Sequence, residues 1–185
     1  SLAQGSHAFY YAFGGLHWHS LGYSGTEIGT LWTLGVFVEI ALMSISLKLF
    51  RGLGPTGLLL LGGLGCALRW TILAFDPSLP LVIVAQLLHG ATFALPQLGA
   101  MYFILKAVPP RLAATAQSLY AVCALGLMQG LVTLASGPLY PIYGGHTYLL
   151  MSAMGLGAAL FAVMLARRWR GGYITSIGEP MHDTI

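Results

Sequence analysis

The sequence predicts an all-α membrane protein. Of its 185 residues, 57% are hydrophobic and only 7% are charged, whereas a typical soluble domain carries about 25% charged residues. Apolar stretches of about 18 residues or more recur along the chain, and a helix of that length crosses a hydrocarbon core of roughly 30 Å. The mean hydropathy of +0.79 agrees with a chain that is surrounded mainly by lipid.

Six membrane-spanning helices account for these stretches. Ser24 and Glu27 have the S-x-x-E spacing of a capping box, which predicts a helix start. Prolines stand near three further starts, where a missing N–H is harmless, at Pro55, Pro80 and Pro110. The pair Gly137 and Pro138 is expected to end the fifth helix. We therefore expect spans at residues 2–19, 26–48, 56–75, 80–105, 111–137 and 146–166.

The basic residues predict the orientation of these spans. Except for Arg69, they fall in three segments on one side of the membrane, namely Lys48 with Arg51, Lys106 with Arg111, and Arg167 with Arg168 and Arg170. By the positive-inside rule these segments are cytoplasmic. We expect a multi-pass protein of the inner (cytoplasmic) membrane with both ends in the cytoplasm. Because the charges are divided among short segments and form no continuous patch, the sequence argues against nucleic-acid binding.

The chain divides into two parts. Residues 1–170 are expected to form one transmembrane unit, and the polar stretch 171–185 a disordered cytoplasmic tail. The start carries neither an initiator Met nor a signal sequence, so we expect the chain to begin inside a helix of a longer protein. At the outer end of the first span, His17, Trp18 and His19 are expected to anchor the helix at the membrane interface.

A polar stripe runs along the fourth span. Spacings of three and four residues put its members on one helix face, which consists of Gln86, His89, Phe93 and Gln97. Polar groups within a membrane need partners, so this face should meet other helices or a water-filled cavity. The stripe therefore predicts a substrate cavity beside the fourth span.

The first span repeats this pattern. Residues 3–12 and 85–94 share the form A-Q-x-x-H-(small)-x-x-(aromatic)-A, which gives the first span a matching face of Gln4, His7 and Tyr11. The fourth span is the third after the first, which is the offset expected for two three-helix inverted repeats. Transporters built in this way bind their substrate near the interface of the repeats. We expect the two faces to line one cavity.

Several short motifs follow one another along these spans. They are Gln4-Gly5-Ser6-His7-Ala8-Phe9-Tyr10-Tyr11, Gly22-Tyr23-Ser24 with Ile28-Gly29-Thr30-Leu31-Trp32, Leu34-Gly35-Val36 with Glu39, Leu68-Arg69-Trp70, and Gln86 to His89 with Thr92-Phe93. Together they resemble the 3-phenylpropionate permease-like branch of the major facilitator superfamily. The resemblance covers the carboxyl-terminal six-helix half of such a carrier and implies that an amino-terminal half is missing.

The resemblance implies a secondary active transporter. Its expected activity is proton-coupled symport of a small aromatic or other organic carboxylate by alternating access, with the first, second, fourth and fifth spans bordering the cavity. No metal or other cofactor is implied, and the chain is not expected to be an enzyme. One position departs from the family pattern, because Gln97 stands where a second histidine is expected.

Two formally charged residues, Glu39 and Arg69, lie deep within the predicted spans. Each would cost at least about 2.5 kcal/mol without a partner at a helix centre. One interpretation is a fixed ion pair between the second and third spans; the other is that Glu39 faces the cavity and takes up the coupled proton. His7 and His89 likewise either join helices as neutral groups or change charge during transport, since an unperturbed imidazole has a pKa of about 6.5.

Two other functions stay open at this point. The histidines and Glu39 could form a metal or acid–base site of a membrane-embedded enzyme, which would require three ligands to converge. Alternatively, six helices could act alone as a non-catalytic membrane partner. A concave polar face open to an absent half would favour the carrier.

Overall fold

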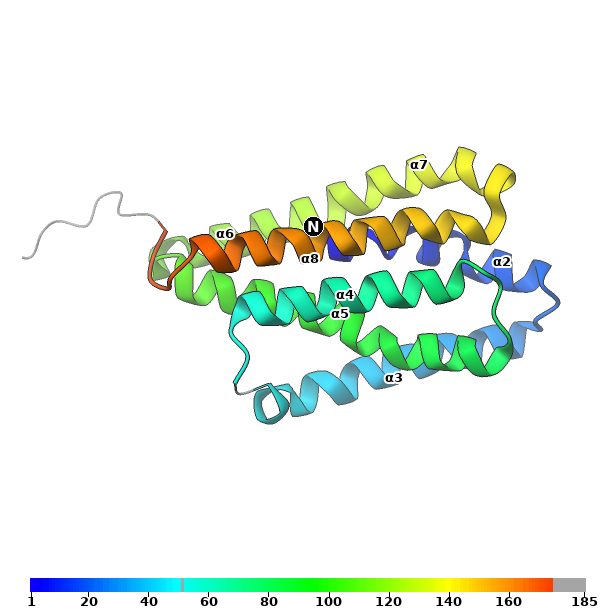
Figure 1. Ribbon diagram of the computed structural model, residues 1–185, viewed down its shortest axis with the longest axis horizontal. Coiled ribbons are helices and arrows are strands. Elements are labelled where there is room, and N and C mark those ends of the chain that lie inside the picture. The colour runs from blue at the N-terminus through cyan, green and yellow to red at the C-terminus, as the bar shows by residue number, and fades with distance from the viewer. Residues whose placement is uncertain (51, 175–185) are drawn as a thin grey trace, which may run out of the picture.

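The computed structural model of the chain describes residues 1–50 and 52–174 (Figure 1). All regular elements in this part are helical. The longer α-helices are α3 (Gly25–Leu49), α4 (Pro55–Leu73), α5 (Leu79–Ala107), α7 (Met128–Tyr143) and α8 (Tyr148–Arg168). Shorter pieces are α1 (Leu2–Gly5), α2 (Gly15–Ser20) and α6 (Ala113–Tyr120), the π-helices η1 (Tyr10–Gly14) and η3 (Ala121–Leu127), and the 3₁₀ turns η2 (Pro110–Leu112) and η4 (Gly144–Thr147).

Four helical stretches in the described part are long and apolar enough to cross a membrane. They are Gly25–Ser46, Pro55–Leu73, Leu79–Ala107 and Pro110–Arg168. The helices predicted at 26–48, 56–75, 80–105 and 146–166 are confirmed, with ends that differ by one or two residues. The helix starts at Ser24, with both hydrogen bonds of the capping box, and at Pro55 also agree with the prediction.

The remaining two predicted spans differ from the observed helices. Residues 2–19 are divided among α1, η1 and α2, because a π-helical turn interrupts the α-helical ladder. The predicted stop at Gly137 is wrong, since α7 continues through Pro138 and Pro141 to Tyr143. The helix stops at Gly144, whose φ of +52° is unfavourable for residues with a side chain.

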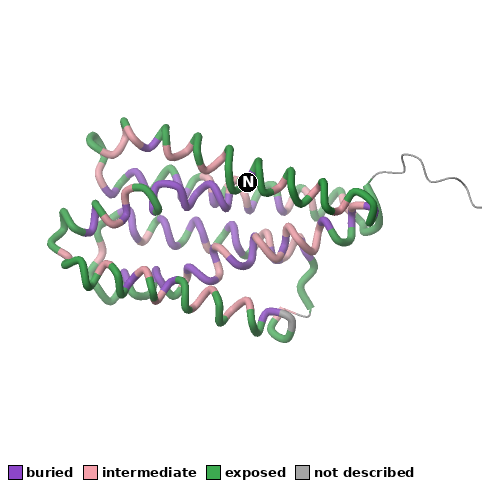
Figure 2. The backbone as a smooth tube through the Cα atoms, turned by 180° about the vertical axis from the view of Figure 1, so that it is seen from behind, coloured by how far each residue is buried: buried purple, intermediate pink, exposed green. Residues whose placement is uncertain are grey.

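The helices pack in layers around α4. Helix α4 lies between α5 and α8, and α3 packs against the other side of α5 (Figure 1). Buried positions run along these inner helices, while α3 and the run from η3 to α7 are mostly exposed (Figure 2). The polar residues of the predicted stripe therefore lie where α1, α4 and α5 meet, close to the less covered helices.

The outer end of the first span does not form the expected interfacial anchor. His17 and Trp18 are buried, and only His19 of the three is exposed. His17 Nε2 lies 2.7 Å from Asp76 Oδ1, and the hydroxyl of Tyr140 lies 3.5 Å from His17 Nδ1. These contacts connect α2, the α4–α5 loop and α7, so the aromatic and imidazole rings turn toward protein instead of the lipid interface.

The last described residues turn back toward α5. Trp169 Nε1 donates a hydrogen bond to the Gly172 carbonyl, and the N–H of Ile174 donates to the carbonyl of Ala107. The rest of the tail predicted at 171–185, from residue 175 onward, lies outside the described residues, as does Arg51.

The contact between α4 and α8 is close enough to test by substitution. A Cβ atom added to Gly155 would lie 2.6 Å from the backbone nitrogen of Ala67, whereas one added to Gly130 in α7 would meet nothing within 4 Å. We expect Gly155→Val to lower the free energy of unfolding by about 1–3 kcal/mol, the usual cost of overpacking. Thermal unfolding in detergent measures this, with Gly130→Val as the matched control. Equal losses in both variants would contradict the packing.

Candidate functional site

The two predicted polar faces meet in the structure. Residues of the first span lie against α5, and the imidazole rings of His7 and His89 are 5.5 Å apart in an edge-to-face arrangement. Gly35 of α3 allows a further helix to approach, since a Cβ there would lie 3.0 Å from Gln86 Oε1 and 3.3 Å from His89 Cδ2. The first span, α3 and α5 therefore meet at one site.

Arg69 lies at the centre of this site and is fully buried. Its Nε donates to the carbonyl of Ala85 at 2.8 Å, its Nη1 lies 2.9 Å from His89 Nδ1, and its Nη2 lies 3.4 Å from Gln86 Oε1. The guanidinium carbon is 4.3 Å from the ring centre of Trp70 and 4.7 Å from that of Tyr10. Hydrogen-bond acceptors and aromatic faces thus surround a charge that would be costly in an apolar interior.

His89 stands between the two formally charged side chains. An arginine can only donate hydrogen bonds, so His89 Nδ1 accepts from Arg69 and the ring proton resides on Nε2. That nitrogen lies 3.5 Å from Oε2 of Glu39, whose side chain is 20% exposed. The direct Glu39–Arg69 contact considered from the sequence is thus replaced by an Arg69–His89–Glu39 chain, in which His89 contacts both charges.

His7 has the opposite tautomer. Its Nδ1 lies 3.0 Å from the carbonyl oxygen of Ala3, which can only accept, so Nδ1 carries the proton. Its Nε2 lies 3.2 Å from the hydroxyl oxygen of Thr92, which also lies 3.4 Å from Nη1 of Arg69. Thr92 therefore links His7 to the chain formed by Arg69, His89 and Glu39.

The glutamines extend the polar site along α5. Gln4 Nε2 lies 3.4 Å from the backbone carbonyl oxygen of Phe93 and 3.4 Å from Oε1 of Gln97. The hydroxyl of Tyr120 donates a hydrogen bond of 2.8 Å to the same Gln97 oxygen. Among the described residues, Gln4 Oε1 and Gln86 Nε2 are buried without a hydrogen-bond partner. One acceptor and one donor are thus left for another polar group.

Aromatic rings form one edge of the site. Trp32 of α3 stacks on Tyr10 at 4.4 Å between ring centres and lies 5.9 Å from Tyr11, which in turn stacks on His7 at 5.9 Å. Tyr11 is 39% exposed, so the edge is open to the surroundings at this ring. The rings of Phe93 and His7 are in edge-to-face contact at 5.8 Å. A planar apolar group can pack beside these rings.

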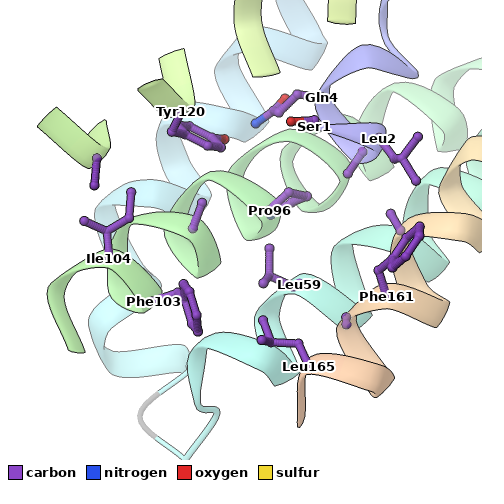
Figure 3. A pocket seen from close by; sticks show the side chains of 15 residues that line it. Ser1, Leu2, Gln4, Leu59, Pro96, Phe103, Ile104, Tyr120, Phe161 and Leu165 are labelled. Atoms are coloured by element: carbon purple, nitrogen blue, oxygen red, sulfur yellow. The ribbon is translucent and has the colours of Figure 1, made fainter. Parts of the chain in front are cut away.

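An apolar cavity of about 490 Å³ lies beside Gln4 (Figure 3). Its polar end is formed by Gln4 and Tyr120, whose polar atoms face each other in Figure 3. Its apolar walls come from α4, α5 and α8 and include Leu59, Pro96, Phe103, Ile104, Phe161 and Leu165. The volume falls in the range of about 300–1,000 Å³ that is common for small-molecule sites.

Trp32, Thr92 and Tyr120 are among the site residues that were not predicted from the sequence. Trp32 precedes Glu39 by seven residues and Thr92 follows His89 by three, so helical spacing could have placed both on the polar faces. Tyr120 had no comparable signal, because the polar residues of its helix are scattered. The alternative of a metal-binding enzyme site requires three converging ligands. The described residues contain no group of three or more His, Cys, Asp or Glu side chains that could hold a metal ion.

The chain is similar to a known protein family and to two named transporters. The model of the MFS_1 like family matches residues 1–151. Over 157 residues the chain is 34% identical to the Escherichia coli (strain K12) protein named "Probable 3-phenylpropionic acid transporter", which covers 85% of this chain and 41% of that protein. It is 28% identical over 144 residues to "Uncharacterized transporter YwbF" of Bacillus subtilis (strain 168). That match covers 76% of this chain and 36% of the Bacillus protein. The chain thus spans well under half the length of these curated relatives. No solved structure matches it.

The opposite tautomers of His7 and His89 can be tested directly. We expect ¹⁵N-histidine spectra of the chain to show a protonated Nδ1 for His7, because the Ala3 carbonyl accepts a hydrogen bond from that nitrogen. We expect a protonated Nε2 for His89, because Arg69 donates to its Nδ1. Two-bond ¹H–¹⁵N correlation measures this, with signals assigned from His7→Gln and His89→Gln variants. The same tautomer at both positions would contradict the hydrogen-bond network.

Proposed function

The chain belongs to the MFS_1 like family, within the 3-phenylpropionate permease-like branch of the major facilitator superfamily, and from this premise we propose that it forms half of a secondary active transporter. The transported substrate is a small aromatic or other organic carboxylate, and the coupling ion is a proton. The observation that carries the proposal is the buried Arg69–His89–Glu39 chain beside an aromatic edge. The printed name of the Escherichia coli relative supports the choice of an aromatic acid.

Charge balance explains why a carboxylate would move together with a proton. Without substrate, the positive charge of Arg69 and the negative charge of Glu39 cancel across His89. A substrate carboxylate alone would leave one uncompensated negative charge in an environment where such charges are costly. If Glu39 takes up a proton, the site returns to neutrality when the anion binds. This argument favours one proton for each monovalent carboxylate.

His89 connects protonation to substrate binding. While Glu39 is charged, its carboxylate attracts the Nε2–H of His89. A proton on Glu39 removes that attraction and leaves the Nε2–H free to donate to the substrate carboxylate. Arg69 stays in place and maintains the His89 tautomer, because its Nη1 occupies the Nδ1 side of the ring. Arg69 therefore acts as a positioning residue that does not contact substrate.

The substrate ring is assigned to the aromatic edge and the adjoining apolar space. Tyr11 and Trp32 present faces on which an aromatic ring can stack. The buried, unpaired amide atoms Gln4 Oε1 and Gln86 Nε2 would add an acceptor and a donor once the surrounding side chains open. Phe93 and Gln97 complete the side of the site contributed by α5. The proposed ligand is thus held by an apolar contact at one end and by His89 at the other.

Transport would require a second half. We assign residues 1–170 to two three-helix inverted repeats of the inner membrane, with both ends cytoplasmic, and the incomplete coverage of the relatives supports a partner half outside this chain. The extensive exposed surfaces of α3 and of η3 to α7 support the same assignment. Rocking of the two halves would alternate access to the site between them. Relatives that are named transporters support a non-enzymatic role.

The role of Glu39 can be tested by removing its charge. In cells that express the complete coding sequence, uptake of labelled 3-phenylpropionate should rise as the external pH falls, since protons drive symport. Glu39→Gln cannot take up the proton, so we expect its initial uptake rate to be at least about tenfold lower in acid and nearly independent of pH, as losses of about 10²–10⁴ are typical for proton-transfer groups.

Glu27→Gln is the matched control for this test. Glu27 is exposed and caps α3, and a glutamine can make the same cap. Membrane insertion of both variants is verified by immunoblotting of isolated membranes. Wild-type pH dependence in Glu39→Gln would overturn the proposed proton coupling.

The aromatic edge predicts substrate selection. Trp32→Ala should raise the KM for 3-phenylpropionate about 3- to 10-fold, which corresponds to the binding free energy of one aromatic contact. The KM for an aliphatic acid of similar length should stay nearly unchanged. Uptake kinetics with both acids measure the difference. Phe37→Ala on the same helix is the control, because the Phe37 side chain is exposed and is not among the rings that contact Trp32. Equal effects on both acids would contradict stacking on Trp32.

A further inference from the structure

A second cavity lies at the end of the molecule that carries most of the basic residues. It measures about 640 Å³ and lies between the start of α4, the end of α5 and the segment that follows α8. Gly54 to Thr56, Lys106 and Arg170 contribute polar and charged groups to it. This cavity is separate from the site around Arg69 and shares no lining residue with the cavity beside Gln4.

Its charge is positive and uncompensated within the described residues. The acidic side chains of residues 1–50 and 52–174 are Glu27, Glu39 and Asp76, and none of them lines the cavity. The ammonium of Lys106 and the guanidinium of Arg170 form no ion pair with them. The first turn of α4 adds backbone N–H groups, because its N-cap is Gly54 and no side chain caps it. An anionic group would therefore be attracted to the cavity.

The walls are shaped by contacts that hold the chain after α8 in place. The indole of Trp169 packs edge-to-face on Phe103 at 5.0 Å and donates to the carbonyl of Gly172. Gly171 and Gly172 have φ values of +99° and +77°, which glycine adopts readily and which bend the chain back toward α5. The hydrogen bond from Ile174 to Ala107 closes this bend. Arg170 is consequently carried by an ordered loop next to Lys106.

Apolar side chains border the same cavity. Leu105 is 73% exposed and Tyr173 is 52% exposed, and both contribute to the lining. A ligand there meets cations and backbone N–H groups on one side and exposed apolar surface on the other. Phospholipids have this division between a phosphate headgroup and acyl chains. Basic pockets at the ends of transmembrane helices are suited to anionic headgroups.

We propose that this cavity binds the phosphate headgroup of an anionic phospholipid, with Lys106 and Arg170 as the headgroup ligands and Leu105 and Tyr173 in contact with the acyl chains. A soluble phosphate ester offers the same headgroup chemistry without acyl chains. The lipid is favoured because the cavity lies at the ends of membrane-spanning helices and has exposed apolar walls. The proposal is independent of which substrate the protein transports.

Native mass spectrometry of the full chain in mild detergent tests the proposal. The delipidated protein is titrated with dioleoyl phosphatidylglycerol, dioleoyl phosphatidylcholine or glycerol 1-phosphate. We expect the anionic lipid to bind at least about tenfold more tightly than phosphatidylcholine, because each cation near an anionic headgroup contributes about 1 kcal/mol. It should also bind more tightly than glycerol 1-phosphate, which has no acyl chains to contact Leu105 and Tyr173. Equal binding of phosphatidylcholine would overturn the role of charge, and equal binding of glycerol 1-phosphate would overturn the role of the lipid.

A pair of double variants separates the cavity from general surface charge. Lys106→Gln with Arg170→Gln should weaken phosphatidylglycerol binding about tenfold. Lys48→Gln with Arg168→Gln removes the same residue types from exposed positions outside the cavity lining and should change binding less than about twofold. Circular dichroism verifies that both variants keep their helices. Equal weakening in the two double variants would overturn the proposed site.

Discussion

The burial of the Arg69 charge is the constraint on which the arrangement of the polar residues depends. A guanidinium group enclosed by helices must find acceptors within a few ångströms, because water is not available to solvate it. Helix α5 therefore turns the carbonyl of Ala85 and the side chains of Gln86 and His89 toward α4. Glycine at position 35 then lets α3 approach closely enough for Glu39 to reach His89. One buried cation thus determines how three helices are oriented.

This arrangement also connects structure with the proposed transport cycle. Opposite charges on Arg69 and Glu39 are separated by a neutral ring that contacts both, so a change in charge at Glu39 alters the hydrogen bonds of His89 without moving Arg69. Thr92 extends the network to His7, and the glutamines extend it toward the apolar cavity. A polar group that enters the site meets a network whose members are already oriented by one another, which reduces the reorganisation required on binding.

Sequence patterns predicted the helices well where chemistry at a single position decides the outcome. The capping box at Ser24 and the proline at the start of α4 define helix starts through local hydrogen bonding. The stop predicted at Gly137 was wrong because Pro138 and Pro141 each remove only one backbone donor, and the helix continues to Tyr143. The π-helical turns were not predicted. In the site, helical periodicity identified His7 and His89 as candidates. The contact partner of Glu39 depends on distances between helices, and these cannot be derived from the spacing within any one of them.

The close approach of α4 and α8 limits how this molecule can move. A Cβ atom at Gly63 would lie 2.6 Å from the backbone nitrogen of Ala159, so the two main chains touch with no side chain between them. Ser152 adds hydrogen bonds to Thr71 and to the carbonyl of Ala67 across the same contact. Helices joined in this way cannot slide past one another without separating. Helices α4 and α8 are therefore expected to move together as one rigid unit.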